Sequence, residues 1–302
     1  MGLSEKWDYQ KNMLAYQLMS SRTHTIGIIV PEIFTSFFPS IILGAQEAAQ
    51  KAGYNVLICQ SNEQYTTEVA NAKIMLANRV DGVLVSVTKE TQSIEHLETF
   101  RRKGIPIVMF NRIWSEFKVP KVVVDDYGGA FQIVEHLIST GKRRIAHLAV
   151  PSKLYNLRKR KEAYLDALRK HNLPIDPDLL IEYDLNVDKV KIYVKHLLDL
   201  PEPPDALFTV HDPAAIEAIQ VIKSRGLSIP DDIAVVGFSN DRIGAYIEPG
   251  LTTILQPTHE MGRVAVQLLL NIMDKDVSEW KTVQKVLKPE LIIRGSSQRK
   301  EI

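Results

Sequence analysis

The stretch IGIIVP at residues 26–31 resembles IAHLAVP at residues 145–151. Two more pairs follow in the same order, VDGVLVS (80–86) with PDALFTV (204–210) and IPIVMFN (from Ile105) with IPDDIAVVGFSN (from Ile229). Each pair is offset by roughly 120 residues, close to the length of one domain. We interpret the series as two similar halves from an ancient duplication, with chance similarity among apolar strands as the alternative.

Both halves alternate short β-branched runs with longer amphipathic stretches. Strands are predicted at 26–30, 55–60, 82–85, 107–110, 145–150, 206–210 and 234–238, and helices at 37–52, 68–78, 94–103, 158–171 and 214–224. Continuous apolar strands separated by helices indicate parallel sheets covered on both faces. The expected fold is α/β, with two doubly wound parallel-sheet lobes.

Two such lobes create a ligand cleft, because ligands of these sheets lie beyond the carboxyl ends of the strands. The residues that follow the predicted strands are mainly aromatic, hydroxyl and amide side chains. They are Phe34 to Phe38, Ser61, Asn62, Ser86, Thr88, Asn111, Arg112, Ser152, Asn156, Arg160, His211, Asp212, Ser239 and Asn240. This chemistry suits a small polyhydroxylated or heterocyclic ligand.

Composition excludes several other classes of protein. The 302 residues are 45% hydrophobic and carry a formal net charge of +1, so the bulk surface is not a general nucleic-acid binder. Cys59 is the only cysteine, which fits a reducing cytosol. No apolar run reaches the roughly 20 residues of a membrane span, and no signal core is visible. We expect a cytoplasmic protein that makes no membrane contact.

Motifs for catalysis or metal binding are lacking. HEMGR at 259–263 has no second histidine for zinc, and neither a GxSxG elbow nor a GxxxxGK phosphate loop occurs. We therefore expect no enzyme activity, no cofactor and no metal.

An ordered series of segments resembles the lactose/galactose-repressor (LacI/GalR) family from about Tyr9 to Ser297. It comprises TIGIIVPEI, VDGVLVS, PIVMFNR, VVVDDYGGAFQIVEHLISTGKRRIAHLA, DALFTVHDPAAIEAI, IPDDIAVVGFSND and PGLTTILQP. The resemblance implies a type I periplasmic-binding-protein-like fold and a homodimeric, effector-responsive transcription regulator, expected to be a repressor. It divides the chain into a hinge remnant (1–22), a first lobe (23–150 plus 257–288) and a second lobe (151–256 plus 289–302).

The resemblance also selects effector-binding residues. They are Phe34, Thr35, Phe38, Ser86, Asn111, Arg112, Asp126, Asn156, Arg160, His211, Asp212 and Ser239. Arg160 aligns with a ligand-binding arginine and is expected to face the cleft, so its loss should hardly affect stability; the alternative is a solvated basic face. Phe38 could stack on ligand or belong to the core. Asp126 and Asp212 could bind ligand or cap helices.

Three positions depart from the family pattern. Ser239 replaces an aspartate that usually holds ligand hydroxyls, His211 replaces an asparagine, and Thr35-Ser36 replaces Asn-Pro. The effector is expected to be a sugar or a sugar derivative.

Near the N-terminus, YQKNMLAYQL resembles the family's hinge segment. Ala15 and Leu18 fall on the positions that enter the DNA minor groove, where an apolar side chain kinks the duplex. A helix-turn-helix headpiece would precede Tyr9, so we expect operator DNA binding only with that missing headpiece. Two alternatives remain, a solute-binding protein of a sugar transporter and an enzyme that uses the cleft.

Overall fold

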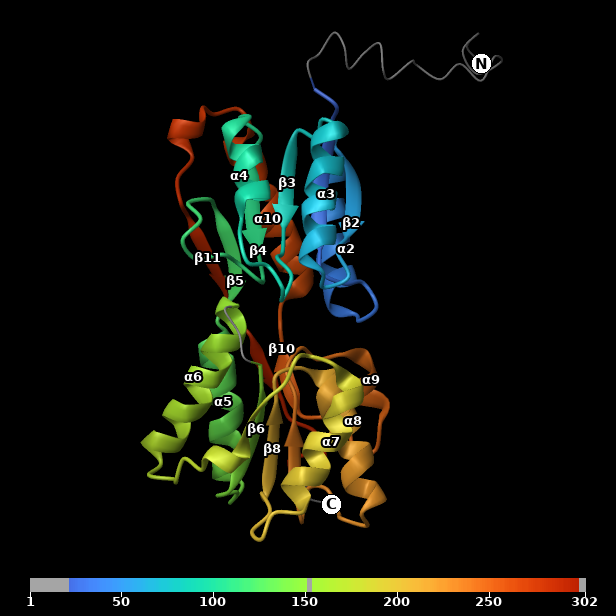
Figure 1. Cartoon of the computed structure of the whole chain (residues 1–302), viewed down its shortest axis with the longest axis vertical. Helices are drawn as coiled ribbons and strands as arrows, with labels where there is room; N and C mark the ends of the chain where they lie inside the picture. Colours follow the sequence, from blue (N-terminus) through green and yellow to red (C-terminus); the bar gives the residue numbers. More distant parts are fainter. Residues whose placement is uncertain (1–21, 151–153, 299–302) are drawn as a thin grey trace, which may run out of the picture.

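The computed structural model describes residues 22–150 and 154–298, which form two α/β lobes stacked along the long axis of the molecule (Figure 1). Each lobe contains a parallel sheet with helices on both faces. The expected fold class is therefore confirmed. Ala15 and Leu18 lie outside the described residues, and their role stays a prediction.

The first lobe is built on six parallel strands in the order β11-β5-β4-β3-β1-β2. The strands are β1 (Thr25–Val30), β2 (Asn55–Gln60), β3 (Gly82–Val85), β4 (Ile107–Phe110), β5 (Lys121–Val124) and β11 (Gln284–Leu287). Helices α2 (Phe37–Lys51) and α10 (Thr258–Met273) cover one face, and α3 (Tyr65–Ala77) and α4 (Glu95–Arg102) cover the other. The central strands are fully buried because both of their faces are covered by helices.

Helices α2 and α10 approach each other closely through two glycines. A Cβ at Gly44 would overlap the His259 carbonyl, and a Cβ at Gly262 would overlap the Ile41 carbonyl. The apolar face of α2 is thus covered by α10 of the same chain. Among the large apolar side chains of α2, Phe38, Ile41 and Ile42 are buried, and Leu43 is exposed.

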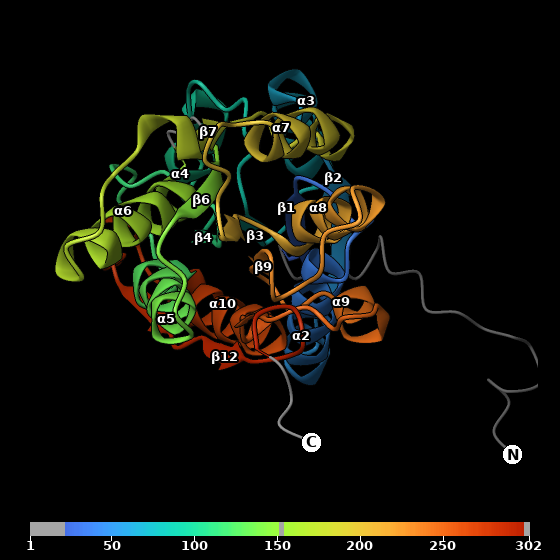
Figure 2. The same ribbon diagram turned by 90° about the horizontal axis from the view of Figure 1, so that it is seen from below.

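The second lobe has four parallel strands in the order β7-β6-β8-β9, with a separate antiparallel pair β10-β12. Its strands are β6 (Ile145–Ala149), β7 (Leu180–Glu182), β8 (Ala206–Thr209), β9 (Ala234–Val236), β10 (Thr253–Leu255) and β12 (Glu290–Ile292). Helices α5 (Asp126–Ser139) and α6 (Tyr155–Lys170) cover one face, and α7 (Val187–Leu198) and α8 (Asp212–Ser224) the other, with short α9 (Arg242–Tyr246) after β9. Figure 2 shows this arrangement from below.

The chain passes between the lobes three times. It crosses from β5 into α5 at Asp125, from β10 into α10 at Gln256-Pro257, and from β11 into β12 at Lys288-Pro289. The chain thus re-enters the first lobe at α10 and leaves it again after β11.

The predicted lobe boundary at residue 150 is wrong. Helix α5 packs on α6, and β6 pairs with β7 and β8, so the segment after β5 already belongs to the second lobe. Ile133 and Leu137 of α5 are buried in one cluster with Tyr164 of α6. The hydrophobic periodicity of α5 predicts that one face of the helix is buried, but it does not predict which helix that face packs against. The predicted strands themselves agree with the structure to within one or two residues.

Candidate functional site

A cleft between the two lobes encloses about 910 Å³, counting the part that opens to solvent. Its lining comprises Glu32, Phe34, Thr35, Ser36, Phe37, Phe38, Glu63, Lys89, Asn111, Arg112, Asn156, Leu157, Arg160, Leu185, Val187, Val210, His211, Pro213, Ser239, Asp241 and Gln256.

Most of the residues selected from the sequence line this cleft. They are Phe34, Thr35, Phe38, Asn111, Arg112, Asn156, Arg160, His211 and Ser239. Ser86, Asp126 and Asp212 do not line the cleft. Each bonds to a residue that does, namely Arg112, Arg160 and Asp241 respectively. Ser86 accepts a hydrogen bond from the Arg112 amide (3.4 Å), and Asp126 pairs with Arg160.

The loop after β1 is held in place by Glu32. Its buried carboxylate accepts hydrogen bonds from the Phe34 amide (2.7 Å), the Thr35 amide (3.0 Å) and the Thr35 hydroxyl (2.6 Å). The Phe34 side chain remains 81% exposed at the mouth of the cleft, so its ring is free to contact a ligand. Phe38 differs, because its ring is only 2% exposed and makes edge contacts with Phe37 and Phe110. It contributes to the core and to the wall of the cleft.

Arg160 is a buried structural cation as well as a lining residue. Its Nε and Nη2 donate to Asp126 Oδ1 (2.9 and 2.7 Å), its Nη1 donates to the Val210 carbonyl (2.5 Å), and its guanidinium lies 3.6 Å from the centre of the Phe238 ring. Both charged side chains are almost fully buried. The expectation that Arg160 is dispensable for stability is therefore wrong, because its loss would leave a buried carboxylate unpaired.

Neighbouring residues, rather than Asp126 and Asp212, cap the two helices. Asp125 caps α5 by accepting from the Gly128 amide (2.8 Å), and His211 caps α8 by accepting from the Ala214 amide through Nδ1 (3.1 Å). The two aspartates are instead the first residues of their helices, with side chains turned inward and buried.

His211 and Asp212 have perturbed ionisation. Burial, and then the positive charges of Arg160 and Arg112, lower the pKa of His211 to about 4, so the ring is neutral at pH 7. Its Nε2 lies 3.2 Å from the Tyr183 hydroxyl. Burial raises the pKa of Asp212 to about 6, against the effect of the hydrogen bond from Thr253. Asp212 also accepts from the Asp241 amide (2.6 Å) and so fixes the loop after β9.

Two buried amide oxygens in the cleft wall have no hydrogen-bond partner among the described residues. They are Asn156 Oδ1 at the start of α6 and Gln256 Oε1 where the chain crosses to α10. Gln256 Nε2 donates to Ser239 Oγ (3.2 Å), which links the crossing segment to the loop after β9. Unpaired buried acceptors cost about 1–3 kcal/mol each, and a ligand hydroxyl or N–H could satisfy them.

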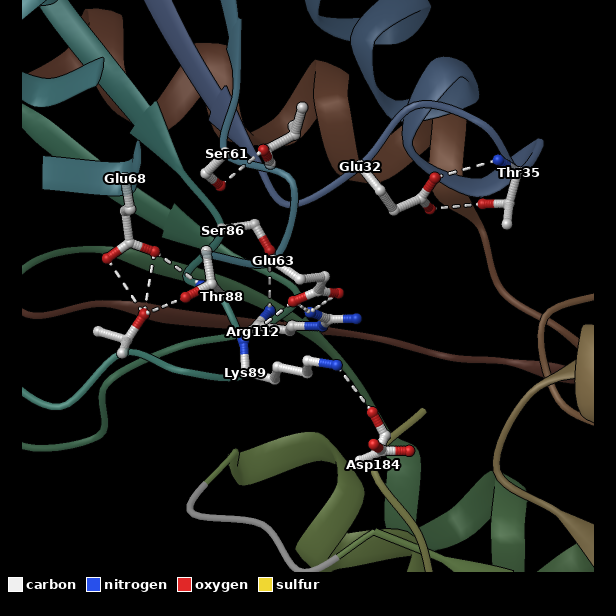
Figure 3. Close-up of polar contacts among 12 residues, drawn as sticks. Glu32, Thr35, Ser61, Glu63, Glu68, Ser86, Thr88, Lys89, Arg112 and Asp184 are labelled. Carbon is white, nitrogen blue, oxygen red and sulfur yellow. Dashed lines mark hydrogen bonds and ion pairs between the residues drawn. The ribbon is translucent and has the colours of Figure 1, made fainter. Parts of the chain in front are cut away.

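On the first-lobe side, Glu63 forms the centre of a polar network (Figure 3). Its carboxylate accepts from Arg112 Nη1 (2.6 and 2.8 Å) and from the Lys89 amide (3.0 Å). The Lys89 ammonium reaches across to the Asp184 carbonyl of the second lobe (2.8 Å), as Figure 3 shows. A second contact joins the lobes, from the Ser36 hydroxyl to Asp241 (3.2 Å).

Sequence reasoning missed several functional residues of the cleft. Glu32, Glu63, Lys89, Asp241 and Gln256 line it but were not selected as effector-binding residues. Glu63, Lys89 and Asp241 each come one residue beyond a position that was selected as following a strand. A wider window after each predicted strand would have found these three.

Comparison with known proteins places the chain in a family. Residues 134–297 match the family profile described as periplasmic binding protein-like domain. Catabolite control protein A of Priestia megaterium is 31% identical over 93% of this chain and 84% of its own length. The transcriptional repressor CytR of Escherichia coli is 32% identical over 96% of this chain and 84% of its own length. The chain belongs to the LacI family of transcriptional regulators.

Solved structures of transcriptional regulators share the fold. The regulator CelR in complex with cellobiose superposes with a TM-score of 0.82 at 27% identity, covering 97% of this chain and 88% of that one. A LacI-family regulator from Enterococcus faecium with bound ribose gives 0.79 at 26% identity, covering 92% and 100%. The resemblance inferred from the sequence is confirmed, and a ligand-responsive regulator is favoured over a transporter's solute-binding protein.

Two further findings concern alternative roles. Within residues 22–150 and 154–298, no group of three or more histidine, cysteine or acidic side chains is arranged to hold a metal ion. None of the helices in that same part of the chain has the length and apolarity needed to traverse a bilayer.

Proposed function

We propose that this LacI-family regulator binds a sugar or sugar derivative in the cleft between its lobes, and that binding alters its affinity for operator DNA. The observation that carries the proposal is the pair of buried, unpaired acceptors on Asn156 and Gln256 in a cleft that also exposes Phe34. Sugar hydroxyls supply donors for these oxygens, and an aromatic ring packs on the apolar face of a sugar. Cellobiose and ribose in related regulators support the same ligand class.

Thermal denaturation with a panel of sugars tests this proposal. Cellobiose, D-ribose and other neutral sugars are added to the protein, and a ligand at 100 times its dissociation constant adds about 2.7 kcal/mol of stability. Asn156→Ala is the matched variant, because it removes one unpaired acceptor. A sugar that stabilises the parent should stabilise this variant less, and calorimetry should give a weaker affinity. A panel without effect on the parent, or a sugar bound equally by both proteins, contradicts the proposed site.

Ligand control follows from the inter-lobe contacts. The bonds from Ser36 to Asp241 and from Lys89 to Asp184 join lobes that otherwise meet through the crossing segments and the cleft. A ligand that favours one lobe arrangement shifts the population toward it. Coupling to DNA affinity is expected to be about 1–3 kcal/mol. DNA contact is proposed to occur through a headpiece of the family type, with Ala15 and Leu18 at the minor groove.

We also propose that the regulator is a homodimer. Leu43 of α2 and Ile243 and Tyr246 of α9 are 52%, 60% and 81% exposed, and Figures 1 and 2 place α2 and α9 on the same side of the two lobes. Light scattering should give a dimer mass. Tyr246→Arg should convert it to a monomer, whereas Ile192→Arg on α7, at a position that is 66% exposed, should not. A monomeric parent contradicts the proposal.

A further inference from the structure

The charged side chains that line the cleft balance one another. Three are cationic and three are anionic: Lys89, Arg112, Arg160, Glu32, Glu63 and Asp241. His211 adds no charge at pH 7, since burial lowers the pKa of its ring to about 4.

Each of these charged side chains interacts with another group of the protein. Glu32 holds the loop after β1, Arg160 is paired with buried Asp126, and Lys89 donates to the carbonyl of Asp184. Arg112 lies beside the aromatic wall of the cleft, with its guanidinium 6.0 Å from the centre of the Phe38 ring. Whether Arg112 can bind an anion therefore depends on its partner, Glu63.

The backbone holds Glu63 against Arg112. Asn62 and Glu63 both have positive φ (52° and 59°), which is unfavourable for residues with a Cβ and turns the chain sharply after β2. The Glu63 amide donates to the Pro31 carbonyl (3.1 Å), and its carboxylate accepts from the Lys89 amide as well as from Arg112. The side chains of Arg112 and Glu63 are only 12% and 20% exposed, so solvent screens the pair weakly.

We propose that Glu63 is a specificity-determining residue, which occupies Arg112 and thereby reserves the cleft for uncharged ligands. The inference rests on the proposed function of the cleft as the effector site. Glu63 bonds to Nη1 of Arg112, so a ligand phosphate or carboxylate that bonds to the other guanidinium nitrogens would lie beside the partly buried Glu63 carboxylate. The two negative charges would repel each other at a site where solvent screens them weakly. A neutral polyol bonds to the existing pair without displacing it, because the pair offers donors and acceptors.

Glu63→Gln tests this inference with inorganic phosphate and D-ribose 5-phosphate as probes. The variant keeps the shape and an acceptor oxygen but removes the charge that competes for Arg112. Calorimetry at low ionic strength and pH 7.5 should give at least about tenfold tighter binding of both probes than in the parent, since hydrogen bonds to charged groups are of that strength. The gain should disappear in the double variant Glu63→Gln/Arg112→Gln.

Two controls make the result specific. Glu98→Gln removes the same charge as Glu63→Gln, but from a residue of α4 that does not line the cleft. This control variant should bind phosphate as the parent does. Glu63→Gly tolerates positive φ and serves as a second charge-removing variant, in which the same gain is expected if Glu63→Gln folds poorly.

Equal binding of phosphate and D-ribose 5-phosphate by the parent and both Glu63 variants would overturn the inference. So would a gain that persists without Arg112. D-ribose is measured in parallel because it tests the proposed function separately. A parent that binds neutral sugars while the Glu63 variants gain no anion binding refutes the specificity role alone, whereas anion gain without any sugar response refutes the sugar effector alone.

Discussion

Replacing Arg160 by methionine should cost the second lobe about 3–5 kcal/mol of unfolding free energy. The change removes a guanidinium that donates twice to Asp126 and once to the Val210 carbonyl, at a site where both charged side chains are about 95% buried or more. Removing one partner of a buried ion pair typically costs this amount, because the other charge is left uncompensated. Methionine retains much of the apolar stem, so the effect comes from the guanidinium, whose hydrogen bonds and stacking on Phe238 are both removed.

Urea unfolding followed by circular dichroism measures this loss. Arg169→Met is the matched control, because Arg169 pairs with Asp166 on the surface of the same helix, α6, with side chains 60% and 43% exposed. Surface pairs of this kind contribute about 0–1 kcal/mol, so the control should be nearly neutral.

The loss should also depend on pH. Burial already raises the pKa of Asp126 in the parent, and removal of the Arg160 charge raises it further. A carboxyl whose folded pKa exceeds its unfolded value stabilises the protein below the unfolded pKa and loses that contribution as pH rises through the folded value. The deficit of Arg160→Met should therefore be smaller at pH 5 than at pH 7.5. A loss below about 1 kcal/mol, or one that is equal at the two pH values, refutes the reasoning.

Three further outcomes are expected. Ser239→Asp should strengthen binding of sugars with adjacent hydroxyls by about tenfold (~1.4 kcal/mol) in calorimetry, because a carboxylate accepts from two hydroxyls; an unchanged ligand profile would place Ser239 outside the site. Asp212 has a pKa raised to about 6, so in urea unfolding the parent should gain stability relative to Asp212→Asn as pH falls from 7.5 to 4.5, and a constant difference contradicts this. Gly262→Ala should cost about 1–3 kcal/mol in thermal unfolding, because the new methyl group overlaps the Ile41 carbonyl, whereas exposed Gln267→Ala should not destabilise.

The elements of the sheets were predictable because their signals are local. The strands at 55–60, 82–85 and 107–110 coincide with β2, β3 and β4, since short apolar runs between turns mark the strands of a parallel sheet. The lobe to which α5 belongs was not predictable in this way. Its assignment depends on packing against α6, a long-range choice that leaves no period in the sequence.

The same distinction separates the site residues. Positions directly after strands, such as Asn111 and His211, were found because parallel strands bring their carboxyl ends to one edge. The partners of those residues were not found. That Arg112 is paired with Glu63, and Arg160 with Asp126, depends on side chains 49 and 34 residues apart meeting in the folded chain. Each helix cap lies one residue before the aspartate that was considered as a cap. Asp125-Asp126 offers two candidates of equal chemistry, whereas at His211-Asp212 the capping acceptor is a histidine ring nitrogen, although aspartate is the usual cap.

The crossing between β11 and β12 leaves very little chain that is free to bend. Leu287 is paired with β5 in the first lobe and Glu290 with β10 in the second, so only Lys288 and Pro289 lie between the two paired ends, and the proline ring fixes φ at one of them. A rotation of one lobe against the other must then turn about a short joint between the lobes. Displacement grows with distance from such a joint, and the start of β1 lies at the far end of the first lobe (Figure 1). When the lobes close slightly around a ligand, the largest displacement is therefore expected at the start of β1, where the chain enters the first lobe.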